Sequence, residues 1–133
     1  MKKGYITNIE RATKDNENFR RVLYTAPHSQ LALMALKPGE ENGEEVHETV
    51  DQFFRFESGQ GKVVINGLAS EVADGTAVIV PAGARHNVIN TSMSEPLKLY
   101  TIYSPANHRD GIAHATKQQA EADGEYFDGK ITE

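Results

Sequence analysis

The chain has 133 residues, enough for one domain with its own apolar core, and it contains no cysteine, which excludes disulfide bonds, thiolate zinc sites and cysteine nucleophiles. The formal net charge is −5 and there is no basic cluster, so we expect no binding to nucleic acids or to anionic membrane surfaces. Residues 1–13 lack a secretory signal pattern and no apolar run is long enough to span a bilayer, so we expect a cytoplasmic protein.

Short apolar runs follow one another through the middle of the chain, with turn residues about every 8–12 positions, the spacing of all-β sandwiches and barrels. The first run, residues 31–36, is apolar at odd and even positions alike, which predicts a strand covered on both faces. Asn66 and Gly67 form a hairpin-type signal after the third run. In chain order, the predicted strands are residues 31–36, 53–56, 62–66, 76–80, 87–89 and 97–103.

The composition changes beyond the last predicted strand. Residues 106–115 are polar and carry His108 and His114, which we expect at the surface of a loop near the barrel mouth, where either could also serve as a general base. Residues 114–123 are rich in Ala, Gln, Glu and Lys, which are good helix formers. They predict a helix packed on the outside or the rim of the barrel.

Four polar side chains are predicted to meet at one end of this barrel. Glu45 and His47 are two residues apart, so on a strand both side chains point to the same face. Gln52 precedes the run 53–56 and its parity places it on the inward face. His86 follows a Pro-Ala-Gly turn that can return it to the same end. Converging nitrogen and oxygen donors are what a divalent transition metal requires.

The stretch from Gly75 to Asn90, G-T-A-V-I-V-P-A-G-A-R-H-N-V-I-N, resembles the second sequence motif of the cupin superfamily. That motif is Gly, five residues, Pro, one, Gly, two, His, three, Asn, and every defined position is matched. The resemblance is specific because five defined positions are matched at fixed spacing.

The first cupin motif is Gly, five residues, His, one, His, three or four, Glu, six, Gly. Gly39, His47 and Gly59 fall at the required spacings, but Glu45 stands where the first histidine is usual and Gln52 where the glutamate is usual. The ligand charge stays at −1 with an ionised Glu45, while the donors change from three nitrogens and one oxygen to two of each. Harder ions are favoured over copper by that change, and the amide predicts looser binding.

The resemblance implies a double-stranded β-helix, the RmlC-like jelly roll, with a short C-terminal helix. It implies one domain over residues 1–133, with a barrel at about 20–105 and a loop and helix at 106–133. The implied cofactor is one divalent ion, Zn, Mn, Fe or Ni, on Glu45, His47, Gln52 and His86.

Some alternatives stay open for the site. Glu45 and Gln52 are also compatible with a barrel mouth that holds no metal. Asp51 could replace Gln52 as a ligand if the loop shifts, and it otherwise stands as a solvated or supporting carboxylate. The candidates for an acid or base are Asp51, His108 and Tyr103.

The sequence is similar to small cupins described as mannose-6-phosphate-isomerase-like. That similarity implies Lewis-acid chemistry of the isomerase, epimerase or tautomerase type on a small sugar or keto-acid-like substrate. No arginine cluster for a sugar phosphate is visible. A non-haem metal dioxygenase and a non-catalytic module for small ligands are the alternatives. We also expect a homodimer.

Overall fold

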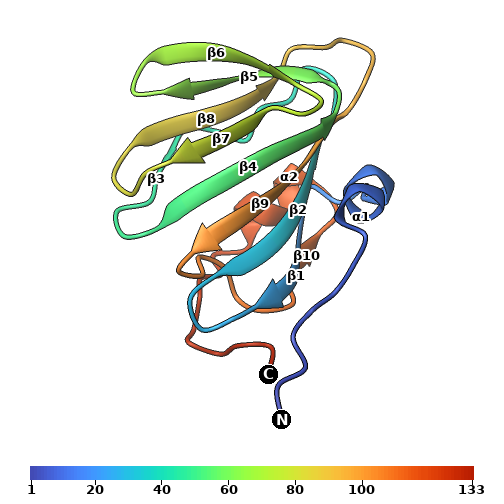
Figure 1. Cartoon of the computed structure of the whole chain (residues 1–133). Helices are drawn as coiled ribbons and strands as arrows, with labels where there is room; N and C mark the ends of the chain where they lie inside the picture. The colour runs from blue at the N-terminus through green and yellow to red at the C-terminus, as the bar shows by residue number, and fades with distance from the viewer.

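The computed structural model describes residues 1–133 and is built mainly of antiparallel strands, with two short helices (Figure 1). In chain order the elements are α1 (Ile9–Asp15), β1 (Arg20–Thr25), β2 (Gln30–Leu36), β3 (Glu45–Val46), β4 (Asp51–Ser58), β5 (Gln60–Ile65), β6 (Leu68–Ala73), β7 (Ala77–Val80), β8 (Arg85–Asn90), β9 (Leu97–Ser104), β10 (Ala113–His114) and α2 (Lys117–Ala122).

The strands form two sheets that face each other. Six strands make one sheet in the order β10-β1-β2-β9-β4-β7, and four make the other in the order β3-β8-β5-β6. Several strands pair with a strand that is not next to them in sequence, as β2 does with β9 and β5 with β8. The predicted all-β jelly roll with a short C-terminal helix is confirmed.

Each of the six predicted strands overlaps an observed one, namely β2, β4, β5, β7, β8 and β9. The sequence did not indicate β6, because this edge strand is mostly exposed and offers little apolar alternation. It also did not indicate β1, in which two arginines interrupt the apolar pattern. The helix α1 begins at an Asn8 cap, whose side chain accepts a hydrogen bond from Arg11 N.

The apolar core lies between the sheets. Twelve buried residues form its main cluster, which includes Phe54, Phe56, Leu36, Leu97 and Leu99. Burying side chains of this size contributes about 1.5–3 kcal/mol each. Strand β2 is buried on both faces, as its unbroken apolar run predicted, since α1 covers the outer face of the six-stranded sheet against β9, β4 and β2.

Gly59 sits in the tight turn between β4 and β5 and cannot be replaced without moving the backbone. Its φ is +96°, in the left-handed region that favours glycine, and an added Cβ would lie 2.4 Å from the carbonyl oxygen of Pro96. This turn fixes the direction of β4, which carries Gln52.

Asn90 ends β8 and ties together two loops, the one after β2 and the one between β8 and β9, at the end of the barrel away from His86. Its Nδ2 donates to the carbonyl oxygens of Leu36, Lys37 and Glu95 at 3.1, 3.0 and 2.9 Å. Its Oδ1 accepts from Ser92 N at 2.9 Å. The amide is 1% exposed, so every polar atom of a buried side chain is satisfied here.

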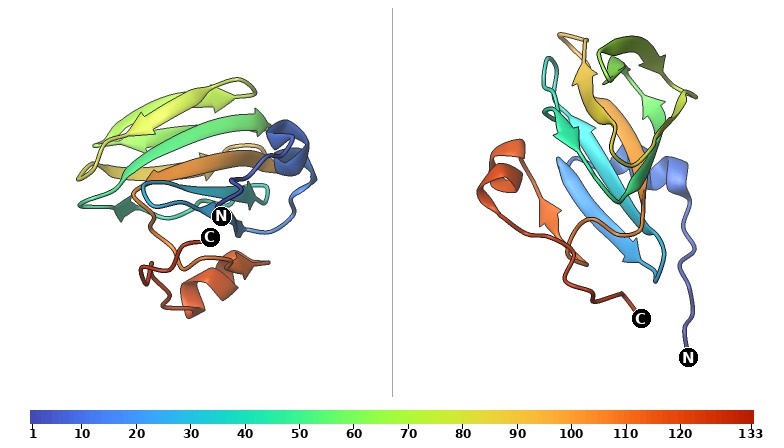
Figure 2. Two further views of the ribbon diagram at one scale, coloured as in Figure 1. Left: turned by 60° about the horizontal axis from the view of Figure 1, so that its bottom comes forward. Right: turned by 90° about the vertical axis from the view of Figure 1, so that its left-hand side faces the viewer.

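The C-terminal segment differs from its prediction. The helix α2 is shorter than residues 114–123, because Thr116 caps it by accepting from Gln119 N, while His114 belongs to β10 and pairs with Arg20 of β1. Figure 2 shows β10 and α2 outside the barrel, beside the β1 edge. No helix in the structure combines the length and apolarity needed to span a membrane.

Candidate metal centre

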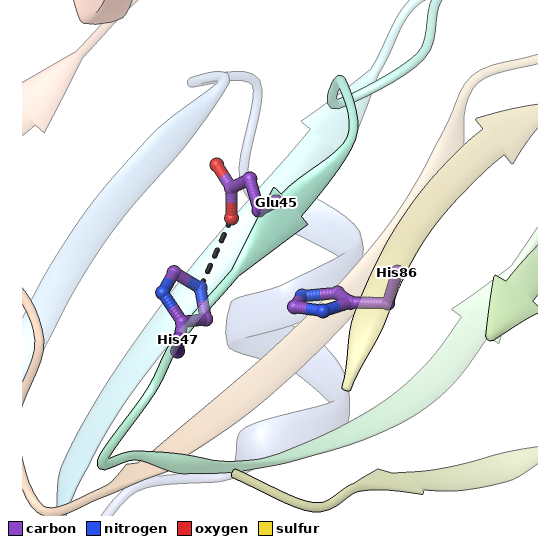
Figure 3. Close-up of side chains that lie close together, drawn as sticks. All are labelled: Glu45, His47 and His86. Atoms are coloured by element: carbon purple, nitrogen blue, oxygen red, sulfur yellow. Dashed lines mark ion pairs between the residues drawn. The ribbon is translucent and has the colours of Figure 1, made fainter. Parts of the chain in front are cut away.

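Strands β3 and β8 bring three polar side chains together. Glu45 lies opposite His86 in the ladder between these strands, and His47 follows on the same side as Glu45. Figure 3 shows the three side chains converging from the two neighbouring backbones. One ligand atom from each can be chosen so that all lie within 4.8 Å of one another. The sequence-predicted convergence of these three residues is therefore present.

The His86 ring is held so that one nitrogen faces the cluster. Its Nδ1 lies 3.1 Å from the carbonyl oxygen of Ala84, an arrangement in which Nδ1–H donates and Nε2 keeps its lone pair. Burial lowers the pKa of His86, and the nearby His47 lowers it further. The neutral imidazole, which is the form that binds metals, is therefore favoured.

Glu45 and His47 approach each other closely. His47 Nε2 lies 3.0 Å from Glu45 Oε2, an ion-pair distance, although the ring nitrogen lacks a well-directed hydrogen bond. Burial raises the pKa of Glu45, but the adjacent His47 ring and the charge of Arg20 outweigh this effect, so the pKa lies below its usual value. Glu45 is therefore a carboxylate near neutral pH and supplies the negative charge of the cluster.

Gln52 of β4 is 3% exposed and points inward, as its parity predicted. Its Nε2 donates to Thr101 Oγ1 at 3.0 Å, which fixes the amide, while Oε1 is buried without a hydrogen-bond partner. Its pairing partner on β9 is Tyr103, whose ring centroid lies 6.2 Å from that of His47. Gln52 therefore lies in the wall beside the cluster, with a free acceptor.

Three buried ring or amide atoms of the predicted ligands lack a directed hydrogen bond: Gln52 Oε1, His86 Nε2 and His47 Nε2, the last of which lies 3.0 Å from the Glu45 carboxylate. Buried polar atoms are nearly always paired, and each unpaired one costs about 1–3 kcal/mol. All three can present a lone pair, and an ionised carboxylate stands beside them. The ligand atoms of Glu45, His47 and His86 lie close enough together to hold one divalent cation, and Gln52 Oε1 is a further free acceptor in the adjoining wall.

Asp51 lies outside the cluster. It is exposed at the start of β4, next to Gln52 but on the opposite parity, and its Oδ1 accepts from Ala82 N at 2.8 Å. That bond fastens the Pro-Ala-Gly turn that leads to His86. The structure thus brings Asp51 to the turn and leaves it apart from Glu45.

Tyr103 and His108 form a second polar group beside the cluster. Tyr103 is 1% exposed, and its hydroxyl lies 3.1 Å from His108 Nε2. Burial raises the pKa of Tyr103 to about 12, so the hydroxyl keeps its proton at neutral pH. His108 Nδ1 lies 2.8 Å from Glu125 Oε2, which orients the imidazole.

The expectation that His108 and His114 are surface residues was wrong, since both are buried. The loop is pulled inward by Gln30, whose Oε1 accepts from His108 N at 3.0 Å and whose Nε2 donates to His108 O at 2.7 Å. The ring of His114 lies 3.0 Å from Asp123 Oδ2.

Sequence reasoning missed three residues of this region, namely Arg20, Gln30 and Glu125. Arg20 carried a usable signal, because it shares the inward face of β1 with Val22. A lone arginine on a buried face is unusual. Glu125 had none, because its partner His108 lies on a different part of the C-terminal segment and their contact depends on the course of the chain between them.

Comparisons with known proteins agree with this architecture. A family model described as the Cupin domain matches residues 32–103. The chain is 48% identical over 126 residues to an uncharacterised Bacillus subtilis protein, YrkC, covering 90% of this chain and 67% of that protein. An uncharacterised protein of Acanthamoeba polyphaga mimivirus is 39% identical over 124 residues, covering 90% and 77% of the two chains. The crystal structure of BH2720 from Bacillus halodurans superposes with a TM-score of 0.88 at 43% identity, covering 91% and 96%.

Proposed function

The chain belongs to the cupin family, and from this membership we propose that it is a metal-dependent enzyme with one divalent ion on Glu45, His47, Gln52 and His86. The proposed activity is of the isomerase, epimerase or tautomerase type. Its proposed substrate is a small molecule with a carbonyl group, of the sugar or keto-acid kind.

The observation that carries the proposal is the set of unpartnered buried atoms on His47, Gln52 and His86. Without a cation, these three atoms are desolvated and no hydrogen bond offsets that cost. When bound, a divalent ion supplies Lewis-acid polarisation of a carbonyl oxygen. Two oxygens and two nitrogens favour Mn, Fe, Zn or Ni over copper.

The chain itself offers an acid and base pair next to the cluster. The Tyr103 hydroxyl, still protonated near neutral pH, can donate a hydrogen bond to a developing enolate oxygen. His108 stands behind it, held by Glu125, and can accept or return a proton at Nε2. Such a pair supports proton transfer between neighbouring carbon and oxygen atoms, which is the chemistry shared by isomerases and tautomerases.

The phosphosugar version of the proposal has less support. A sugar phosphate usually requires several basic groups, and Arg20 is the buried cation that the structure brings near the cluster. We therefore propose the carbonyl chemistry of the mannose-6-phosphate-isomerase-like cupins on a smaller substrate that lacks a phosphate.

Elemental mass spectrometry of protein purified without an affinity metal column or chelators tests the metal site. We expect close to one Mn, Fe, Zn or Ni per chain in the wild type and almost none in a His47→Ala/His86→Ala double variant. His28→Ala is the matched control, because His28 is an exposed histidine in a turn and its loss should leave the metal content unchanged.

The identity of the metal directs the activity assay. Zinc or manganese leads to tests of sugar and keto-acid isomerisation, while iron leads to oxygen consumption and would favour the dioxygenase alternative. A folded wild type that takes up no metal, even after soaking, would overturn the proposal and leave a barrel that binds small ligands without turnover.

A further inference from the structure

The starting observation is a buried arginine at the first residue of β1. Arg20 is 7% exposed, while the adjacent Arg21 is exposed, as alternation along a strand requires. Val22, on the same face as Arg20, packs in one apolar cluster with Tyr103. The Arg20 side chain therefore points into the barrel and not into solvent.

Arg20 forms no ion pair at contact distance within the chain. Its Nη2 donates to the neutral Oδ1 of Asn42 at 3.2 Å, and its guanidinium carbon lies 5.2 Å from the ring centroid of Phe19. Its Nε is buried with no hydrogen-bond partner. No carboxylate oxygen lies within 4.0 Å of an Arg20 nitrogen.

An arginine in this position is costly unless an anion completes it. The guanidinium stays charged at every relevant pH, and a buried charge without a hydrogen-bonded counter-ion is strongly unfavourable. Arg55 offers a contrast within the molecule, since its Nη1 lies 3.3 Å from the carboxylate of buried Glu57. Arg20 lacks the carboxylate partner that Glu57 provides for Arg55.

The charge of Arg20 reaches both parts of the candidate site. Burial raises the pKa of Tyr103, and the positive charge of Arg20 opposes that rise. Arg20 and Glu45 also line one cleft, so Arg20 lies beside the metal cluster.

A small cleft opens beside Arg20. Its volume is about 150 Å³, and its other polar lining residues are Asn42, Glu45, Lys117 and Glu121. Drug-sized ligands occupy pockets of about 300–1,000 Å³, so this cleft suits a molecule of only a few heavy atoms. Lys117 is already paired with Glu121 at 3.7 Å, which leaves Arg20 as the cation that lacks a carboxylate.

We propose that Arg20 binds the carboxylate of a small organic acid beside the metal cluster, so that the substrate is a 2-oxo acid or 2-hydroxy acid. A guanidinium presents paired N–H donors that match a planar carboxylate. The neighbouring oxygen of such an acid would then face Glu45 and His47. The choice of acid rests on the proposed function, whereas the anion site rests on Arg20 alone.

Isothermal titration calorimetry on metal-loaded full-length protein tests the proposal with pyruvate, its neutral methyl ester and inorganic phosphate as probes. We expect pyruvate to bind and the ester to bind at least about tenfold more weakly. Arg20→Gln should raise the Kd for pyruvate at least about tenfold, and Arg20→Lys should raise it less. Arg21→Gln, one residue away on the outer face, is the matched control and should leave the Kd unchanged.

Each other outcome has a definite meaning. Equal binding of pyruvate and its ester to the wild type would overturn the proposal, and that comparison needs no variant to fold. Arg20-dependent binding of phosphate without binding of pyruvate would also overturn it, in favour of a phosphate ligand. Metal content measured on the same samples separates the two proposals, because a protein without metal that still binds pyruvate through Arg20 fails the proposed function and keeps the anion site.

Discussion

Two buried amides at opposite ends of the barrel show different uses of the same chemistry. Asn90 and Gln52 are both almost fully buried, at 1% and 3% exposure. Both polar atoms of the Asn90 amide are hydrogen-bonded to neighbouring backbone groups. The Gln52 amide bonds only Thr101, through its nitrogen, and its oxygen has no partner. The first end is complete in itself. The second leaves a buried acceptor unpaired, as the proposed metal site requires.

Replacement of Asn90 by alanine should have the largest effect on stability. The change strips partners from the carbonyl oxygens of Leu36, Lys37 and Glu95 and from Ser92 N. We expect the free energy of unfolding to fall by about 2–4 kcal/mol, measured by urea denaturation with chelator present. The folded fraction should still bind metal at full stoichiometry, and a loss below about 1 kcal/mol would remove the contrast between the two ends.

Gln52→Leu should act in the opposite way. The side chain is of similar size, and only the Thr101 bond is lost, so the metal-free protein should change in stability by no more than about 1 kcal/mol. The affinity for metal should fall at least about tenfold, or about 1.4 kcal/mol, in a competition titration. Gln52→Glu keeps an oxygen donor and adds charge, so it should bind metal more tightly than wild type. Unchanged affinity in the leucine variant would remove Gln52 from the ligand set.

The two ends should also differ in their response to pH, because the titratable groups gather at the Gln52 end. Burial lowers the pKa of His108 in the folded protein, while the unfolded chain takes up this proton at about pH 6.5. Stability is therefore complete above that pH and is lost as the pH falls towards the folded pKa. One such proton contributes a slope of at most about 1.4 kcal/mol per pH unit.

Urea denaturation of metal-free protein between pH 8 and pH 5 measures this slope, and His108→Gln should reduce it. His86 acts in the same direction, since its pKa is also lowered by burial, and Glu125 adds a loss at lower pH because its pKa lies below the usual value. Stability that stays flat or rises on acidification would contradict the assignment of His108 as a buried neutral ring.

Arg85→Ala should have the smallest effect, although Arg85 is adjacent to His86 in sequence. Its Nη1 pairs with Glu44 at 2.8 Å, but the two side chains are 62% and 58% exposed, so the pair contributes less than about 0.5 kcal/mol. Metal content should match the wild type by elemental mass spectrometry. Loss of metal in this variant would contradict the prediction that only the inward-facing donors, and not residues adjacent to His86 in sequence, govern metal binding.

The sequence was informative where local alternation decides the outcome. The inward direction of Gln52 and the burial of β2 on both faces follow from period-two patterns. The shared direction of Glu45 and His47 follows from their separation by two residues in an extended segment. The burial of His108 could not be predicted in this way. It depends on hydrogen bonds to Gln30 and Glu125, which come from other parts of the chain and follow no local pattern.

Arg20 is an intermediate case. Its inward parity could be deduced once β1 was recognised, but two successive arginines made the strand look polar. The length of α2 shows a further limit, since propensity alone extended the helix to His114, and the Thr116 cap with the β10 pairing ended it earlier.

Gln30 makes the mouth of the barrel open to evolutionary change. Its amide is bonded to the backbone of Asn107 and His108 and to no side chain of that loop. The path of the loop is thereby set without regard to which side chains it carries. Substitutions at these two positions could exchange one reactive group for another while the loop keeps its course, so related chains could acquire new substrates on an unaltered frame.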